Sequence, residues 1–268
     1  MKHLRLAIRA LSFSVVTGTL YGLFLVGSVL LISHRQASRR WRNRVVRTWA
    51  RSAAVILGLK IRVRGTPPKA PFFLVSNHLS YIDIIVFASL VDSVFIAKHD
   101  VADWPIFGAL SRAIDTIFID RNRRSDVVRV NALIRKALAE RVSLTLFPEG
   151  TSTQGSTVLP FKSSLLEPAV EAGVPVSYAA IRYRTSGGQP PAHLAVCWWG
   201  EMGFLSHLFA LLQIPSFEAV VMFGSRTFEK PDRKALAAEL WQAVTEQFIP
   251  IVKQEEECNP TTGNQRAA

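Results

Sequence analysis

Two short polar motifs hold the residues that are best suited to chemistry in this sequence. The first, Asn-His-Leu-Ser-Tyr-Ile-Asp at residues 77–83, has Asp83 five positions after His78. The second, Phe-Pro-Glu-Gly-Thr at residues 147–151, is a turn with an acidic residue. A histidine titrates near neutral pH, and a carboxylate bonded to one ring nitrogen leaves the other nitrogen free to take a proton. The first motif therefore indicates a general base, His78, that is oriented by Asp83.

The spacing of this pair restricts where the two residues can lie. Five positions along an α-helix turn a side chain by about 140° and advance it by about 7.5 Å, so the pair would not meet on one continuous helix. The two meet if His78 lies in a turn and Asp83 in the first turn of the following helix. A second interpretation is purely structural, because Ser80 to Asp83 also fits a capping box ahead of the apolar run 84–90.

Both motifs follow strand-like runs, residues 72–76 and 143–147, and strand ends in an α/β sheet share a crevice. The second motif also has a purely structural interpretation, in which Pro-Glu-Gly forms an ordinary turn and Glu149 faces solvent. Residues 150–157 approach the spacing of a phosphate-binding P-loop, but Ser156 stands where the lysine must be. This departure excludes nucleotide hydrolysis by such a loop.

Four segments of the sequence together point to a family. They are residues 77–83, Phe-Ile-Asp-Arg at 118–121, residues 147–151 and Val-Pro-Val at 174–176. In this order they resemble the four blocks of the glycerolipid acyltransferases, which include the 1-acylglycerol-3-phosphate acyltransferases (the PlsC family), over about residues 70–230. The resemblance implies a base and its carboxylate at His78 and Asp83. It further implies contacts with the acceptor lipid at Arg121, Glu149, Gly150 and Thr151.

Three positions depart from the pattern of that family. Asp115 stands where the second block usually opens with glycine, and Tyr178 where the fourth usually has a second proline. Ser152 follows Gly-Thr where enzymes specific for lysophosphatidate usually have arginine. With Phe161-Lys162 downstream, residues 151–155 look more like family members that act on other lyso-lipids, such as lyso-ornithine lipid. The acceptor therefore stays open between these two kinds of lyso-lipid.

The charges are distributed unevenly along the chain. The net charge is +12, and 14 of the 32 Lys and Arg residues lie in residues 1–82, whereas all 20 acidic residues lie at or after Asp83. A nucleic-acid enzyme would carry its basic patch around the catalytic crevice, but here the excess flanks an apolar segment. We therefore expect a membrane partner and no nucleic acid.

The apolar segment, residues 10–33, is uncharged. As a helix its 24 residues would extend about 36 Å, enough to cross a hydrocarbon core of about 30 Å. More arginines follow it than precede it, which predicts a catalytic part on the cytoplasmic side of the inner membrane. Residues 40–58 predict a second helix with Trp41, Val45 and Trp49 on one side. That helix either lies on anionic lipid or packs over the sheet.

The rest of the chain predicts an α/β fold, a single sheet covered by helices. Strand-like runs occur at 72–76, 94–97, 116–120, 143–147, 174–183, 194–199 and 218–223. Helices are expected from Ser125 and from Pro231-Asp232 to about residue 252. We expect anchoring helices in residues 1–58, an acyltransferase domain in 59–252 and a disordered tail in 253–268. Cys197 and Cys258 show no metal-ligand spacing, so no metal is expected.

These observations predict an enzyme that needs no cofactor. The resemblance implies that it moves an acyl group from acyl-CoA or acyl carrier protein to the free hydroxyl of a lyso-lipid. One alternative is a transacylase that takes the acyl group from a phospholipid without CoA. Another is a non-catalytic membrane protein that binds lipid through its basic N-terminal region.

Overall fold

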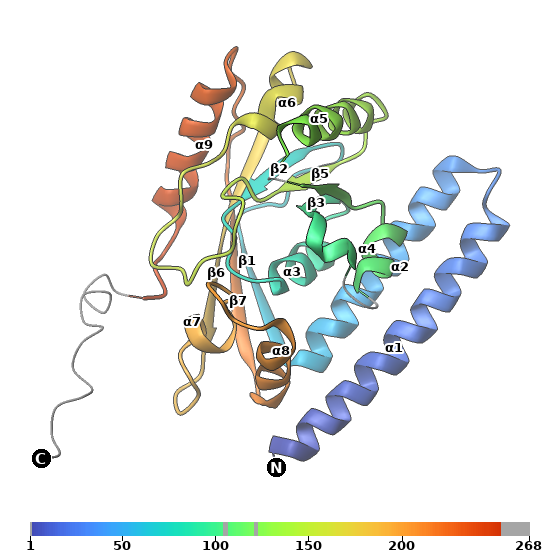
Figure 1. The fold of residues 1–268 in the computed structure, drawn as a ribbon, viewed down its shortest axis with the longest axis vertical. Coiled ribbons are helices and arrows are strands. Elements are labelled where there is room, and N and C mark those ends of the chain that lie inside the picture. Colours follow the sequence, from blue (N-terminus) through green and yellow to red (C-terminus); the bar gives the residue numbers. More distant parts are fainter. Residues whose placement is uncertain (1, 104–106, 121–122, 253–268) are drawn as a thin grey trace, which may run out of the picture.

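The computed structural model describes residues 2–103, 107–120 and 123–252 (Figure 1). Within this part of the chain, seven strands form one mixed sheet in the order β1-β7-β6-β2-β5-β3-β4. The strands are β1 (Leu59–Arg64), β2 (Phe73–Ser76), β3 (Val94–Lys98), β4 (Ile117–Ile119), β5 (Leu144–Leu146), β6 (Val176–Thr185) and β7 (Phe217–Phe223). All neighbours are parallel except β6 and β7. The single sheet that the sequence predicts is therefore confirmed.

The helices surround this sheet. They are α1 (Lys2–Leu30), α2 (Arg35–Leu57), α3 (Ile82–Leu90), α4 (Phe107–Ala113), α5 (Arg124–Ala139), α6 (Glu167–Glu171), α7 (Ala192–Ala195), α8 (Phe204–Gln213) and α9 (Arg233–Gln247), with 3-10 turns at His99–Asp103 and Ser164–Leu166. In Figure 1, α5, α6 and α9 lie at the top of the view and α8 lies at the bottom, beside the start of α1. The central strands β2 and β5 are fully buried, as expected for parallel strands covered on both faces.

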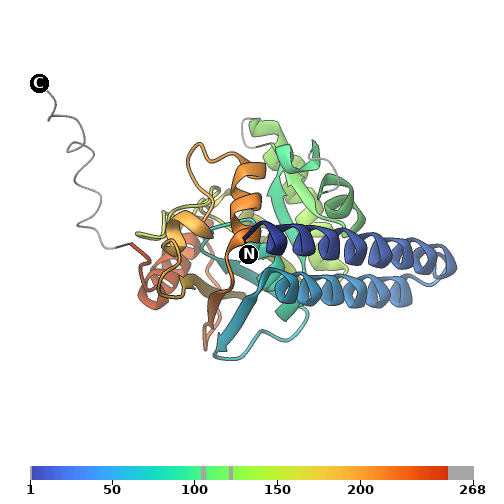
Figure 2. The same cartoon turned by 90° about the horizontal axis from the view of Figure 1, so that it is seen from below.

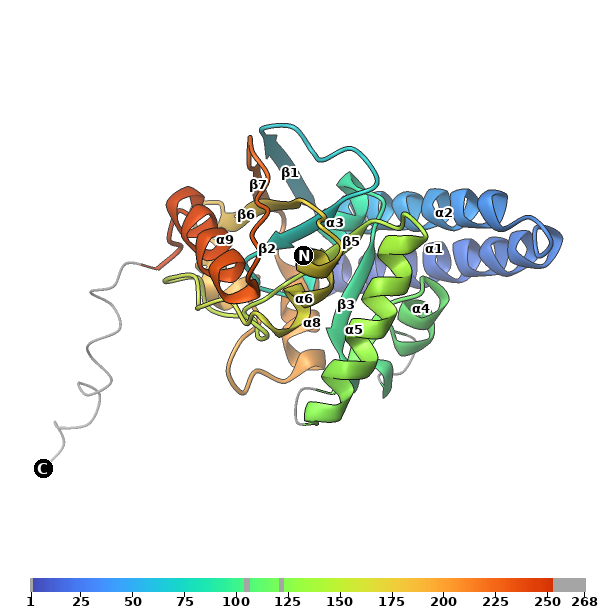
Figure 3. The ribbon, with the colours of Figure 1, turned by 90° about the horizontal axis from the view of Figure 1, so that it is seen from above.

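The two N-terminal helices form an antiparallel hairpin that extends from the domain (Figures 2 and 3). Helix α1 contains residues 10–30 of the predicted apolar segment, and its length and composition make it a candidate membrane span. Along the hairpin, Trp49 Nε1 donates to Thr17 Oγ1 at 3.1 Å. Gly27 lies so close to Trp41 that a Cβ atom there would come within 2.0 Å of the indole nitrogen. Close packing at these two points holds α1 along α2.

Helix α2 starts five residues before the predicted second helix, and it packs against α3 and β1. Its buried positions Ala50, Ala53, Ala54 and Leu57 recur at helical spacing. Three of its arginines form ion pairs with acidic residues of the domain. These pairs are Arg39–Glu140, Arg42–Asp115 and Arg47–Asp92. The structure therefore supports the interpretation in which this helix packs over the sheet.

Some element predictions were wrong in ways that have a physical reason. Residues 194–199 form no strand: α7 ends at Ala195 and a loop follows, in which Val196 and Cys197 are buried although they belong to no strand. The edge strand β1 was missed, although Lys60, Arg62 and Arg64 alternate with apolar residues along it, a pattern that suits an edge strand. Helix α5 starts at Arg124, so Ser125 lies inside it and does not cap it.

The last helix was predicted more closely. The Asp232 side chain accepts hydrogen bonds from the backbone N–H groups of Lys234 and Ala235 and so caps α9. The helix ends at Gln247 rather than near residue 252, ahead of Pro250. The predicted disordered tail, residues 253–268, lies outside the described residues, as does Arg121.

Candidate active site

The structure brings His78 and Asp83 together at the end of β2. His78 lies in the turn after this strand, and Asp83 lies in the first turn of α3. The His78 ring donates from Nδ1 to Asp83 Oδ2 across 2.7 Å. This leaves Nε2 as the ring nitrogen that can accept a proton. His78 keeps 20% of its side chain exposed, whereas Asp83 is fully buried.

The structural interpretation of Asp83 is also partly right. Its Oδ2 atom accepts the backbone N–H groups of Leu79 at 2.7 Å and Ser80 at 3.1 Å. Asp83 therefore stabilises the turn before α3 and orients the His78 ring with the same oxygen. Its other oxygen, Oδ1, accepts the hydroxyl of Tyr183 from β6 at 2.6 Å. The sequence analysis did not identify Tyr183, which is one hundred positions away along the chain.

Glu149 lies behind the histidine. It is 2% exposed, and its two oxygens accept the backbone N–H groups of His78 at 2.6 Å and of Leu159 at 2.8 Å. Burial raises the pKa of Glu149 to about 7, against the opposing effect of the two hydrogen bonds. The structure thus gives this carboxylate a direct role in holding the His78 loop. The solvent-facing turn considered from the sequence is wrong.

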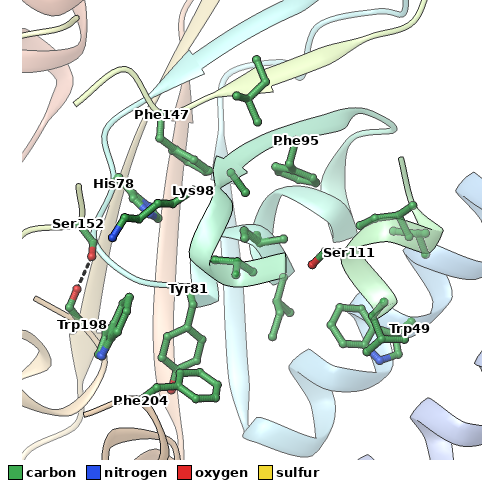
Figure 4. A pocket seen from close by; sticks show the side chains of 18 of the residues that line it. Trp49, His78, Tyr81, Phe95, Lys98, Ser111, Phe147, Ser152, Trp198 and Phe204 are labelled. Atoms are coloured by element: carbon green, nitrogen blue, oxygen red, sulfur yellow. Dashed lines mark hydrogen bonds between the residues drawn. The ribbon is translucent and has the colours of Figure 1, made fainter. Parts of the chain in front are cut away.

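An apolar pocket of about 440 Å³ opens beside His78 (Figure 4). Its walls come from α1, α2, α3, β3, α4 and the loop before α8. Residues that line it include Leu20, Phe24, Val46, Trp49, Tyr81, Ile84, Ile85, Phe95, Ile96, Leu110, Ile114, Phe147, Trp198 and Phe204. The ring of Phe147 stacks on His78, with centroids 4.4 Å apart and planes 18° from parallel. His78 therefore lies at one end of an apolar cavity, while Trp49 and Ser111 lie at the other end (Figure 4).

Comparison with known proteins shows the family. The family model described as Acyltransferase matches residues 60–182. A lyso-ornithine lipid O-acyltransferase from Brucella abortus (strain 2308) is 35% identical over 210 residues, which cover 74% of this chain and 79% of that protein. Another from Rhizobium meliloti (strain 1021) is 38% identical over 198 residues, 69% of this chain and 66% of that protein. The chain belongs to the glycerolipid acyltransferase family.

Two further similarities agree with this assignment. A 1-acyl-sn-glycerol-3-phosphate acyltransferase from Neisseria gonorrhoeae is 28% identical over 76% of this chain and 80% of that protein. The crystal structure of the 1-acyl-sn-glycerophosphate acyltransferase PlsC from Thermotoga maritima has the same fold, with a TM-score of 0.68 at 20% identity over 98% of this chain and 100% of that one. As a member of this family the chain is a lyso-lipid acyltransferase, so the non-catalytic alternative is excluded.

Of the remaining positions that the family resemblance singled out, the structure describes Gly150 and Thr151. Both line the pocket. Gly150 has a φ of +77°, and a Cβ atom there would come within 2.8 Å of Lys162 Nζ, so glycine lets this cation approach the turn. Ser152 donates its hydroxyl to the Trp198 carbonyl. Arg121 lies outside the described residues, and its predicted contact with the acceptor stays a prediction.

Two unusual residues noted in the sequence have clear structural settings. Asp115 adopts a φ of +60°, the left-handed conformation that favours glycine, which is the usual family residue there. Its carboxylate pairs with Arg42. Tyr178 packs its ring on Phe228 and against Gly224, where any Cβ atom would come within 2.2 Å of the ring.

The sequence analysis missed Lys98, which lines the pocket at the end of β3 near the same end as His78 (Figure 4). The strand run 94–97 had been predicted, but nothing in the sequence indicates that this strand end meets the His78 turn. Among the described residues, no group of three or more His, Cys, Asp or Glu residues could hold a metal ion.

Proposed function

We propose that this acyltransferase transfers a fatty acyl group from a thioester, carried by CoA or acyl carrier protein, to the free hydroxyl of a lyso-lipid during membrane lipid biosynthesis. The observation that carries the proposal is the His78–Asp83 pair at the end of an apolar pocket. A substrate without a fatty chain would not need such a cavity, whereas a fatty chain buries its methylene groups there at about 0.8 kcal/mol each.

The proposed reaction uses Nε2 of His78, the ring nitrogen that is not bonded to Asp83. His78 Nε2 takes the proton from the lyso-lipid hydroxyl as its oxygen attacks the thioester carbonyl. The new ester bond forms as the carbon–sulfur bond breaks, and the imidazolium returns the proton to the departing thiolate. The Asp83 carboxylate stabilises the transient positive charge on the ring. Transfer is direct, without an acyl-enzyme intermediate.

Two lysines near the pocket can contribute to this reaction by binding anionic groups of the substrates. Lys98 lines the pocket beside His78, and Lys162 lies against Gly150. We assign them, with the predicted Arg121, to the anionic groups of the acceptor or of the donor. Glu149 contributes by holding the His78 backbone, and the contact between its carboxylate and the acceptor stays a prediction.

The acceptor is the finer part of the proposal. Relatives that share 38% and 35% identity with this chain are lyso-ornithine lipid O-acyltransferases. A phosphate monoester carries nearly two negative charges and favours an arginine fork, but Ser152 uses its hydroxyl on the Trp198 carbonyl. We propose a lyso-lipid without a phosphate monoester, such as lyso-ornithine lipid. Lysophosphatidate is the competing acceptor.

The deciding experiment is an assay of the purified enzyme in mixed micelles. Lyso-ornithine lipid, lysophosphatidate and lysophosphatidylethanolamine are each paired with acyl-CoA, acyl carrier protein and a diacyl phospholipid as donor. We expect thioester-dependent transfer and a preference for lyso-ornithine lipid, which Ser152→Arg shifts toward lysophosphatidate. A wild-type preference for lysophosphatidate of about a hundredfold would refute the acceptor assignment. Transfer from the phospholipid without thioester would establish the transacylase instead.

We also propose that the enzyme works at the cytoplasmic face of the inner membrane. The exposed apolar side chains of α1 recur along one stripe of the helix, and they include Leu4, Ile8, Leu11, Val15, Leu23, Val26, Val29 and Leu30. The pocket reaches this helix at Thr17, Leu20, Tyr21 and Phe24. A lipid acceptor could therefore pass from the bilayer to His78 without crossing water.

A further inference from the structure

A buried tyrosine completes the set of hydrogen bonds around the carboxylate that orients the base. Asp83 Oδ2 accepts hydrogen bonds from the His78 ring and two backbone N–H groups, while Oδ1 accepts the hydroxyl of Tyr183, within the part of the chain that the structure describes. The two oxygens of Asp83 thus have separate tasks. One faces the base and its turn, and the other faces the sheet.

The position of Tyr183 is set by the register of two strands. The Asn77 side chain donates to the Ile181 carbonyl at 3.0 Å and accepts the Ile181 N–H at 2.8 Å, so it continues the pairing of β2 with β6 past the strand end. Tyr183 follows Ile181 by two residues and points to the same face of β6. The same asparagine that precedes the base therefore determines where the tyrosine hydroxyl lies.

The hydrogen bond from Tyr183 to Asp83 is shielded from water because both side chains are buried. Asp83 is 0% exposed and Tyr183 is 1% exposed, so water cannot replace either partner. Burial and the neighbouring carboxylate raise the pKa of Tyr183 well above its usual value, which keeps its hydroxyl protonated and able to donate. A buried carboxylate that loses a donor presents more of its charge to the remaining partners.

We propose that Tyr183 is a positioning residue that sets the basicity of His78 through Asp83. Its hydrogen bond draws negative charge toward Oδ1, away from the imidazole. This limits how strongly Asp83 stabilises the imidazolium, and so limits the loss of free base to protonation. The inference rests on the proposed role of His78 in acyl transfer.

Other titratable groups lie around Asp83 and Tyr183, and their titration must be distinguished from that of His78 in any test. From the elements packed around these two residues they are Tyr81, Lys98, Glu149, Lys162, Cys197 and His207. Because Glu149 has a raised pKa of about 7, the pH profile of activity alone would mix two titrations. A direct measurement on the His78 ring separates them.

The test is an NMR titration of the enzyme labelled with ¹³C-histidine, in detergent micelles. His78 is assigned as the signal lost in His78→Ala. Three versions of the protein are compared with the wild type: Tyr183→Phe, which removes the donor; 3-fluorotyrosine at position 183, which strengthens it; and Tyr178→Phe. The last is a matched control, since Tyr178 is a buried tyrosine on the same strand and touches Phe228 instead of Asp83.

We expect Tyr183→Phe to raise the pKa of His78 by roughly 0.5 to 1 and, because more of the ring is then protonated, to lower kcat at neutral pH by about two- to fivefold at unchanged KM. The fluorinated residue should lower the His78 pKa, and Tyr178→Phe should leave it unchanged. Equal His78 pKa values in the wild type and both Tyr183 versions, or shifts of the same sign, would overturn the proposal. If Tyr183→Phe fails to fold, the near-isosteric fluorinated protein still decides the sign.

The same series separates this inference from the proposed function. If His78→Ala retains full acyl transfer, the assignment of the base fails, whatever happens at position 183. If His78→Ala is inactive and the His78 pKa is indifferent to Tyr183, only the role of the tyrosine fails.

Discussion

The imidazole of His78 is fixed by its neighbours before any substrate binds. Asp83 holds one ring nitrogen, Phe147 stacks on the ring face, and Glu149 holds the backbone N–H. General base catalysis contributes typically 10²–10⁴ in rate, and it depends on such positioning. We therefore expect His78→Ala to lower acyl transfer at least about a hundredfold with unchanged membrane association, measured on the purified, folded protein. Unchanged turnover would remove His78 from the mechanism.

A second substitution separates the two tasks of Asp83. In Asp83→Asn the amide oxygen can still accept the backbone N–H groups of Leu79 and Ser80, and the amide NH₂ can turn toward Tyr183. A neutral amide cannot stabilise the imidazolium, so activity should fall while the midpoint of thermal unfolding changes little. Loss of stability with normal specific activity of the folded fraction would show that Asp83 only caps the turn.

Glu149 makes stability depend on pH with a definite sign. Its pKa is raised from 4.5 to about 7 in the folded state, so the folded protein binds this proton more tightly than the unfolded chain does. The resulting stabilisation is complete below about pH 4.5 and is lost as the pH rises through about 7. We expect the unfolding temperature of the wild type to fall over this window relative to that of Glu149→Gln. A constant difference between the two proteins would contradict this.

The residues of the site differ in how far the sequence could predict them. His78 and Asp83 lie within one local turn, so their spacing predicted that they could meet, and the family resemblance singled them out from the capping alternative. Tyr183 and Lys98 come from β6 and β3, which flank β2 and β5 in the sheet. Strand order and register are set by packing of the whole sheet, and the sequence periodicity carries no information on which strand ends meet. Glu149 was identified from its motif, but its hydrogen bond with the backbone N–H of Leu159 could not be predicted, because no sequence pattern indicates that the loop around Leu159 folds over it.

The helices α1 and α2 act as one unit because they approach closely at Gly27. A leucine there would meet the Trp41 indole, whereas Gly22 on the same helix has no atom within 4 Å of the position of a Cβ. Gly27→Leu should therefore destabilise the protein by about 1–3 kcal/mol through overpacking. Gly22→Leu is the matched control, since it gains the same helix propensity without the clash. Equal unfolding midpoints for the two variants would mean that the hairpin does not pack tightly.

Elements of the fold were predictable where their pattern was local. Strand β2 and helix α9 have uninterrupted apolar positions or a capping aspartate, and both were anticipated. The short helix α7 was mistaken for a strand because four residues are too few to show a helical period. The tertiary context decides such segments.

Helices α1 and α8 lie next to each other (Figure 2), and both carry exposed apolar side chains. On α8, Leu205 is 62% and Phe209 is 49% exposed. If both helices contact the bilayer, Leu205→Gln with Phe209→Gln should weaken binding to anionic vesicles by severalfold, measured by flotation, because apolar area no longer leaves water. The control is Val128→Gln, at a residue 69% exposed on α5, which lies at the opposite end of the view from α8 in Figure 1. Equal losses in both proteins would exclude α8 from the contact.

The hydrogen bonds of Arg9 have a consequence for biosynthesis. Arg9 donates to the carbonyls of Leu212, Ile214 and Pro215, and β1 forms its only strand pairing of the described residues with β7. Helix α1 is synthesised before these partners, so its contacts are complete only once residues 212–223 have been made. Of the two helices that α1 packs against most extensively, α2 and α8, only α2 is present until then, and the apolar side chains of α1 stay exposed. Nascent chains that stop before residue 212 should stay protease-sensitive throughout the N-terminal 64 residues, and chains extended past β7 should become protected together.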